Sequence, residues 1–274
     1  MYKEKNENSN ASTNINSTEM QVIQFAAAQV RELGRFALSF YVLKLLGSVM
    51  GARLHEGYRQ ERKLMPDGIR EPRIKQLTSK MDAKFANDVK SGVIPQTRFL
   101  HINTEGIVEQ DIANTAFTEL SPRWQDDNLN AGFSAMRTIY THWEDIIGEK
   151  ENVESLSTAV GNSIHEYWIG RNSAWLNEEY MALEEKAIDF KSLLAQSNID
   201  IDRKVQIEIE MGAIGKRISE LEELCGAYKD LSKREKDKDL LHAKMAQNFI
   251  GQVYELSKDC IENRFDIENS MEAN

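Results

Sequence analysis

The sequence predicts a mainly α-helical protein made of two tandem helical units. Apolar residues recur at helical spacing over long stretches, and no strand-like alternation of period two stands out. Residues 54–58 (LHEGY) return 110 residues later as 164–168 (IHEYW), and residues 116–123 (AFTELSPR) return 111 residues later as 227–234 (AYKDLSKR). Two different blocks displaced by nearly the same distance indicate an internal duplication.

Composition and charge exclude several classes of function. The chain of 274 residues has a net charge of −10, which disfavours a nucleic acid partner. Cys225 and Cys260 form no CxxC motif or disulfide framework, and no signal-peptide pattern opens the chain, so we expect a cytoplasmic protein. Residues 36–52 are apolar but carry Lys44 and fall short of the roughly 20 residues of a membrane span, so a buried helix is expected there.

The beginning of the chain divides into a tail and a helical segment. Residues 1–18 are rich in Asn, Ser and Thr and predict a disordered tail, with Ser17 or Thr18 capping the next helix. The first unit is predicted over 19–148. Its helical start is expected to break near Gly47 and Gly51.

Each unit carries a different insert. The insert at 64–116 contains three of the four prolines, which predicts a loop-rich segment with one short helix over about 74–91. The second unit is predicted over 149–262, and 263–274 as a flexible C-terminus. Within it, residues 177–226 show heptad spacing on both sides of the polar turn 196–198, which indicates an antiparallel helical hairpin.

After each insert, a serine is expected to begin a helix. Ser121 stands at an N-cap position with Pro122 at the first helical position, where the missing N–H costs nothing. Ser232 and Glu235 have the S-x-x-E spacing of a capping box. Both predicted units therefore begin the same helix with a serine.

The duplicated residues form a motif: an I-H-E-x-W-x-x-R helix, an insert, and a Y-x-x-L-S-x-x-E-K-x-x-D helix. The second unit supplies Ala159, His165, Glu166, Trp168, Arg171, Tyr228, Leu231, Glu235, Lys236 and Asp239. The first unit supplies His55, Glu56, Tyr58, Arg59 or Arg62, Phe117, Leu120, Trp124 and Asn128.

Over about 45–145 and 153–256, this pattern resembles the ryanodine receptor repeat (RyR) domain, which also occurs in standalone bacterial and phage proteins. The resemblance implies two RyR-repeat-like helical units that bind or dock, and it does not imply ion conduction. The family's glycine-tryptophan turn is missing, and Ala174-Trp175 comes nearest to it.

The first unit contains the best candidate ligand site. Residues 59–75 carry six basic and three acidic side chains in a chain that is acidic as a whole, and arginine forks suit phosphate or carboxylate groups. We predict a site for an anionic, nucleotide-like molecule or for an acidic partner segment. Its expected residues are His55, Tyr58, Arg59, Arg62, Arg70, Arg73, Asp111 and Asn114, with His165, Trp168 and Arg171 as equivalents in the second unit.

Each of these residues also has a structural interpretation. The histidines can anchor the inserts through a backbone carbonyl, Tyr58 and Trp168 can be core residues, and Asp111 and Asn114 can form turns. H-E-x-x-H, phosphate-binding glycine loops and nucleophile motifs are absent, so no metal, cofactor or catalytic residue is expected.

Three functions remain open on sequence grounds, of which an enzyme that uses His55 with a carboxylate has the least support, since the sequence indicates no reaction. One is a non-enzymatic binding module that uses the first unit. The alternative is an interaction protein that assembles through the hairpin 177–226, as a homodimer or with a protein partner.

Overall fold

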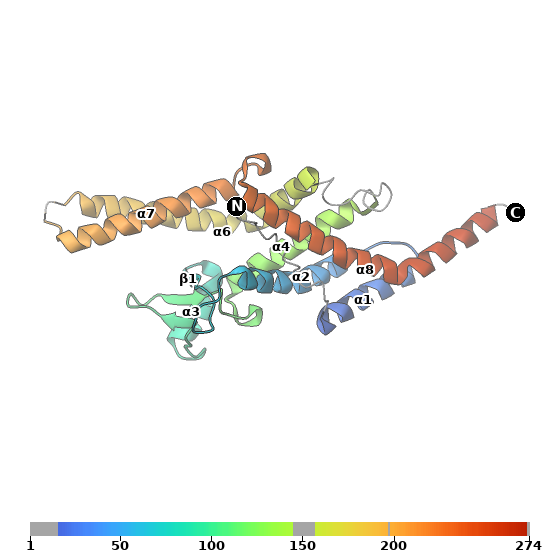
Figure 1. Ribbon diagram of the computed structural model, residues 1–274, viewed down its shortest axis with the longest axis horizontal. Coiled ribbons are helices and arrows are strands. Elements are labelled where there is room, and N and C mark those ends of the chain that lie inside the picture. The colour runs from blue at the N-terminus through green and yellow to red at the C-terminus, as the bar shows by residue number, and fades with distance from the viewer. Residues whose placement is uncertain (1–15, 145–156, 197, 273–274) are drawn as a thin grey trace, which may run out of the picture.

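The computed structural model describes residues 16–144, 157–196 and 198–272, and it is mainly α-helical, as predicted (Figure 1). Most of the predicted tail, 1–15, lies outside the described residues. The prediction was wrong at its end, because helix α1 (Ser17–Leu33) already includes 17 and 18. Its N-cap is Asn16 rather than Ser17 or Thr18, since the Asn16 side chain accepts hydrogen bonds from the backbone of Thr18 and Glu19.

Helix α2 (Phe40–Glu61) runs through Gly47 and Gly51 without the predicted break. The chain breaks earlier, at Gly34, whose φ of 63° ends α1 in the left-handed conformation. The two α2 glycines serve close packing instead. A Cβ atom on Gly51 would lie 2.6 Å from the Asn128 carbonyl oxygen, and one on Gly132 would lie 2.8 Å from the Gly51 nitrogen.

The first insert contains a small sheet that the sequence did not predict. Strands β1 (Ile74–Gln76), β2 (Leu100–Ile102) and β3 (Val108–Asp111) pair antiparallel in the order β1-β3-β2. Such short strands give too few alternations to be recognised. The helix expected over 74–91 is confined to η1 (Lys80–Asp82) and α3 (Ala83–Lys90).

A short 3-10 turn, η2 (Phe117–Glu119), leads into helix α4 (Pro122–Thr141). Ser121 is the N-cap residue, but its hydroxyl makes no capping hydrogen bond, contrary to expectation. Its backbone N–H donates to Gln110 Oε1 at 2.9 Å, which ties the start of α4 to β3.

Helices α6 (Ser157–Leu194) and α7 (Ile201–Leu224) form an antiparallel hairpin that extends from the body of the molecule (Figure 1). Ion pairs join Glu179 to Arg217 at 2.9 Å and Lys186 to Glu210 at 3.3 Å. From the first pair to the second, the residue number on α6 rises from 179 to 186, while that on α7 falls from 217 to 210. The two helices therefore run in opposite directions. The hairpin's apolar seam closes within this chain, around Phe190, Ile207 and Ile214. Residue 197 of the expected turn lies outside the described residues.

The turn η3 (Tyr228–Asp230) leads into the last helix, α8 (Lys233–Glu272). The predicted capping box is only half formed, because Ser232 Oγ accepts from the Glu235 backbone but the Ser232 N–H donates to Glu223 at 2.8 Å. The flexible C-terminus expected at 263–274 was also wrong, because α8 continues to Glu272. No Pro or Gly interrupts the sequence there.

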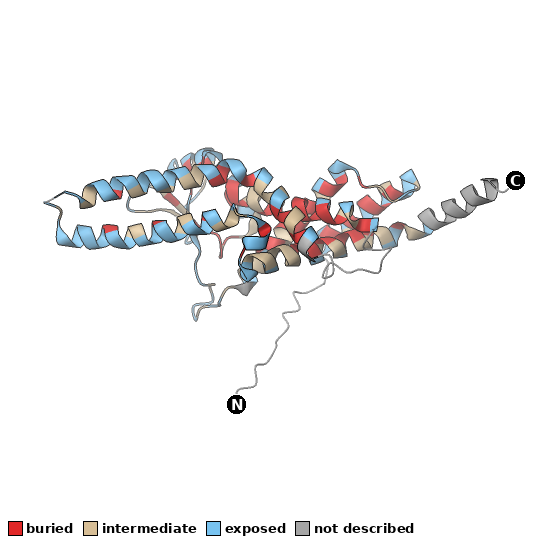
Figure 2. Ribbon diagram, turned by 90° about the horizontal axis from the view of Figure 1, so that it is seen from above, coloured by how far each residue is buried: buried red, intermediate tan, exposed pale blue. Residues whose placement is uncertain are grey.

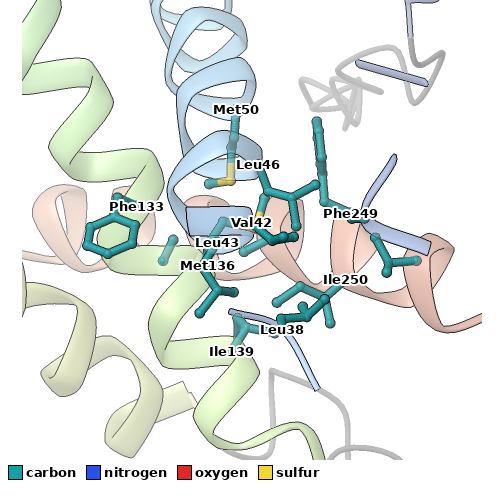
Figure 3. Packing of buried hydrophobic residues seen from close by; sticks show 14 of the residues in the cluster. Leu38, Val42, Leu43, Leu46, Met50, Phe133, Met136, Ile139, Phe249 and Ile250 are labelled. Atoms are coloured by element: carbon teal, nitrogen blue, oxygen red, sulfur yellow. The ribbon is translucent and has the colours of Figure 1, made fainter. Parts of the chain in front are cut away.

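One apolar core joins the two predicted units (Figure 3). α1, α2, α4, α6 and α8 all contribute fully buried residues, such as Ile23, Leu46, Met136, Ile164 and Phe249. Figure 2 shows buried residues gathered at the centre and an exposed outer surface along the hairpin. Among the described residues, no helix is both long and apolar enough to cross a membrane.

Candidate functional site

His55 and His165 make the same contact in the two predicted units, each with a backbone carbonyl just before a 3-10 turn. His55 Nε2 lies 2.9 Å from the Thr115 carbonyl oxygen, and His165 Nε2 lies 3.1 Å from the Gly226 carbonyl oxygen. Because a carbonyl only accepts, each Nε2 carries the hydrogen. Each histidine therefore anchors the end of its insert, just before η2 or η3.

The environment of His55 favours a neutral ring. Burial lowers the pKa of His55, and the neighbouring positive charge of Arg59 lowers it further, whereas the hydrogen bond to Thr115 opposes the shift. With its hydrogen on Nε2, the ring presents Nδ1 as an acceptor. It is thus placed to hold structure rather than to carry positive charge.

Three arginines of the predicted site donate to backbone carbonyls, Arg59 and Arg62 to those of the insert and Arg70 to those at the end of α2. Arg59 donates to the Ala113 carbonyl at 3.1 Å and pairs with Glu56 at 2.6 Å. Arg62 donates to the Glu71 carbonyl at 2.7 Å, and Arg70 donates to the Arg62 carbonyl at 3.1 Å. These bonds hold the segment that follows α2 against the end of that helix.

Asp111 and Asn114 lie behind this segment and act as turn residues. Asp111 Oδ1 accepts from the backbone of Arg73 at 2.9 Å and of Ala113 at 3.1 Å. Asn114 accepts from the Arg70 N–H and donates to the Arg70 carbonyl, both at 2.8 Å. Their polar atoms are used within the protein, and neither residue lines the pocket described next.

Five of the eight predicted first-unit residues line one pocket with a cavity volume of about 80 Å³. One water molecule needs roughly 10–15 Å³, so the cavity is larger than a single-water site. Arg70, Asp111 and Asn114 stand outside it. The pocket is lined by His55, Tyr58, Arg59, Arg62, Arg73, Ile112, Ala113, Trp124, Asp127 and Asn128.

Two cations at this site have no acceptor for their charged ends among the described residues. Arg73 is exposed at the pocket, and partial burial lowers its pKa while Asp127 opposes the shift. Lys75 Nζ lies 5.1 Å from the centre of the Trp124 ring, a cation–π contact. Burial, together with the charges of Arg73 and Arg217, lowers the pKa of Lys75 to about 8.

Asp127 puts a carboxyl group in the same pocket. Burial raises its pKa, and Arg123 and Arg73 act in the opposite direction. Its Oδ1 is buried and has no hydrogen-bond partner among the described residues. The pocket therefore combines positive charge with a buried acceptor.

The second-unit residues predicted as equivalents, His165, Trp168 and Arg171, do not line this pocket. The Trp168 ring meets the Trp175 ring edge to face, with centroids 6.1 Å apart. Arg171 donates to Asn130 Oδ1 at 2.7 Å, and its guanidinium lies 5.2 Å from the Phe133 ring centre. Arg171 thus packs α6 against α4.

Sequence reasoning missed Trp124 and Asp127 as pocket residues. They lie three positions apart on α4 and so share a face of the helix, together with Asn128. That spacing is visible in the sequence. Without the fold, nothing indicates that this face meets the arginines of α2 and the insert.

Among the described residues, no three side chains of His, Cys, Asp or Glu gather where a metal ion would be held. Comparisons with protein-family models, with curated proteins and with solved structures find no match to this chain. The resemblance to the ryanodine receptor repeat therefore stays a prediction, and so does the duplication.

Proposed function

We propose that the protein is a non-enzymatic binding module whose first unit takes a small anionic ligand, nucleotide-like in character, in the pocket between α2, α4 and the first insert. The observation that carries the proposal is Arg73. Its guanidinium lines the pocket and makes no ion pair or hydrogen bond with the described residues.

The other pocket arginines support this function in a different way. Arg59 and Arg62 are fixed by the backbone carbonyls of Ala113 and Glu71. Fixed cations lose little side-chain freedom when a ligand binds, which favours affinity. Arg73 and Lys75 then supply charge that no acidic side chain in the described chain neutralises by direct contact.

The test is a thermal-shift panel of inorganic phosphate, pyrophosphate, nucleotides and small dicarboxylates. At least one anion should raise Tm in a concentration-dependent manner, because ligand that binds only the native state stabilises it. Arg73→Ala should abolish the shift. Arg98→Ala is the matched control, since Arg98 lies in the same insert but pairs with Asp67 at 2.6 Å, away from the pocket.

The proposal fails if no anion in the panel raises Tm at millimolar concentration. It also fails if Arg73→Ala and Arg98→Ala reduce the shift equally, because the effect would then come from general surface charge.

A second candidate function, assembly through the hairpin, is supported by apolar side chains on the outside of α7. Ile201, Val205 and Ile209 are 73%, 51% and 63% exposed, and their i, i+4 spacing puts them on one face. Light scattering coupled to gel filtration should give a mass above 31.4 kDa that falls to the monomer mass in an Ile201→Ser, Ile209→Ser variant. A monomeric unmodified chain excludes the homodimer.

A further inference from the structure

Arg73 and Lys75 put two cations without a counter-ion beside the same pocket. Arg73 lines the pocket, and Lys75 Nζ lies 5.1 Å from the ring centre of Trp124, which lines it too. Neither charged end makes an ion pair or a hydrogen bond with the described residues. Because like charges repel, an occupant of opposite charge would stabilise both side chains.

The backbone turns these two side chains to one side of the insert. They stand two positions apart on an extended segment, where such side chains share a face and lie roughly 7 Å apart. The pairing with β3 extends to Arg73, whose carbonyl accepts from the Ile112 N–H at 3.1 Å. Lys75 pairs with Gln110, which holds the Ser121 N–H at the start of α4. The face that carries both cations is therefore the one turned towards α4.

Solvent reaches both cations. Arg73 is exposed, and Lys75 is half-buried. Lys75 Nζ is not one of the polar atoms that are both buried and without a partner, in contrast to Trp124 Nε1 and Asp127 Oδ1. A ligand that enters from solvent can therefore contact the two charged ends, although it cannot contact those two buried atoms.

The charges around Lys75 leave it ready to accept an anion. Burial and the charges of Arg73, Arg217 and Arg123 lower the pKa of Lys75 to about 8. The acidic group that opposes them is Glu179, but its carboxylate already accepts from Arg123 at 2.7 Å and from Arg217 at 2.9 Å. The ammonium group thus lies among positive charges, and the acid beside it is already paired.

We infer that the pocket takes a ligand with a diphosphate group, whose two linked phosphates pair with Arg73 and Lys75. This inference rests on the proposed function and names the ligand class for the same pocket. A single phosphate held by Arg73 leaves Lys75 without a partner, whereas a second linked phosphate extends towards it. Since one water needs roughly 10–15 Å³, the cavity of about 80 Å³ holds a compact group the size of several waters.

The experiment compares ligands that differ by one phosphate. Calorimetry measures the affinity of the full-length chain for inorganic phosphate, pyrophosphate, AMP and ADP, at constant ionic strength and without divalent cations. Pyrophosphate should bind about tenfold or more tightly than phosphate, and ADP should exceed AMP similarly, because each gains a charge-assisted hydrogen bond to Lys75. The ratio of ADP to pyrophosphate affinity then separates a nucleotide from free pyrophosphate as the source of the diphosphate.

Two variants test the second cation. Lys75→Gln should remove most of the preference for pyrophosphate and leave phosphate binding within about twofold, whereas Lys75→Arg should keep the preference, since it keeps the charge. Lys84→Gln is the matched control. Lys84 belongs to the same insert, but it pairs with Asp88 at 2.8 Å and its side chain is 89% exposed.

Proton uptake on binding gives a readout that a merely structural lysine would not change. At pH 8 roughly half of the Lys75 side chains are neutral, and a bound anion favours the charged form. Arg73, Arg123, Arg217 and Glu179 keep their charges at this pH. Calorimetry in buffers of different ionisation enthalpy should therefore show that the unmodified chain takes up more protons per pyrophosphate than Lys75→Arg, by roughly half a proton at most. The titration of the ligand itself is common to both proteins.

Different outcomes overturn different claims. If pyrophosphate and ADP bind no more tightly than phosphate and AMP, the recognition of a diphosphate is wrong while the anion site stands, and this comparison needs no variant. The same holds if Lys75→Gln and Lys84→Gln weaken pyrophosphate binding equally, or if proton uptake is the same with Lys75→Arg. If none of the four ligands binds, both this inference and the proposed function fail.

Discussion

Tyr58 on α2 and His242 on α8 share a hydrogen bond between the phenol oxygen and Nε2. Their rings meet edge to face, with centroids 6.0 Å apart. Burial, together with the charge of Lys238, lowers the pKa of His242 to about 4, so the ring is neutral at pH 7. The bond joins a residue of the first predicted unit to one of the second, beside the candidate pocket.

Removing the phenol oxygen should destabilise the whole protein. Tyr58→Phe leaves His242 Nε2 buried without this partner, which costs about 1–3 kcal/mol of unfolding free energy. Urea denaturation followed by circular dichroism measures the change. Tyr41→Phe is the control, because Tyr41 is 66% exposed and should lose less than about 0.5 kcal/mol. Equal losses in the two variants would contradict the importance of the bond.

His242 should also make stability depend on pH. Its pKa is 6.5 in the unfolded chain and about 4 in the native protein, so below pH 6.5 the unfolded state binds the proton first. The free energy of unfolding should therefore fall between pH 6.5 and about pH 4, by up to about 1.4 kcal/mol per pH unit.

The measured quantity is the difference in unfolding free energy between the unmodified chain and His242→Gln at each pH. A difference is needed because burial raises the pKa of Asp239 to about 7, which changes stability in the opposite direction over the same range. His101→Gln, at a partly exposed site on β2, is the control. A pH-independent difference would rule out a buried neutral His242.

Gly132 lies where the backbones of α4 and α2 come close together. An added Cβ would lie 2.8 Å from the Gly51 backbone nitrogen and would also meet the Gly47 carbonyl, where only backbone stands in the way. Gly132→Ala should therefore lower stability by about 1–3 kcal/mol or more, since the helices must separate.

Gly215→Ala is the matched control on α7. Nothing lies within 4 Å of its added Cβ, so the higher helix propensity of alanine should raise stability by up to about 1 kcal/mol. Thermal melts of the two variants should thus move in opposite directions. A neutral Gly132→Ala would show that the helices adjust without loss.

Glu179 bridges two arginines from different helices. It accepts from Arg123 at 2.7 Å and from Arg217 at 2.9 Å, while Arg123 also lies 4.3 Å from the Trp175 ring centre. Although burial opposes the shift, the hydrogen bond and charge of Arg217 and the charge of Arg123 keep the pKa of Glu179 below its usual value.

Removing the charge of Glu179 should lower the free energy of unfolding much more than removing the charge of Glu178. Glu179→Gln leaves the buried Arg123 without its charged partner, so we expect a loss of about 3 kcal/mol in chemical denaturation. Glu178→Gln should lose less than about 1 kcal/mol, because Glu178 pairs at 3.8 Å with Lys80, whose side chain is 91% exposed. Similar losses for both would contradict the bridging role.

The sequence predicts the helices better than the insert. Long apolar periodicity identifies α4 and α7, because each buried face repeats over many turns. The three-residue strands β1 and β2 cannot be recognised in this way, since their pairing with β3 decides their conformation. The first helical segment breaks at Gly34 rather than at Gly51. Packing against α4 keeps α2 continuous at Gly51, and this distant contact cannot be predicted from the local sequence.

In the candidate site too, residues close together in the sequence could be predicted as neighbours, whereas residues brought together only by the fold could not. Helical spacing places His55, Tyr58 and Arg59 near one another, and these residues do line one pocket. The presence of Trp124 and Asp127 at the same pocket depends on which groups the fold brings near them. No spacing rule contains that information.

The core shared by α1, α2, α4, α6 and α8 links the evolution of the two halves. Buried side chains interdigitate at near-crystalline density, so a larger residue at Ile23 needs a smaller one opposite it, for example on α8. We therefore expect compensating substitutions between the halves, and a half transplanted from a distant relative should fit poorly until its contact residues are changed with it.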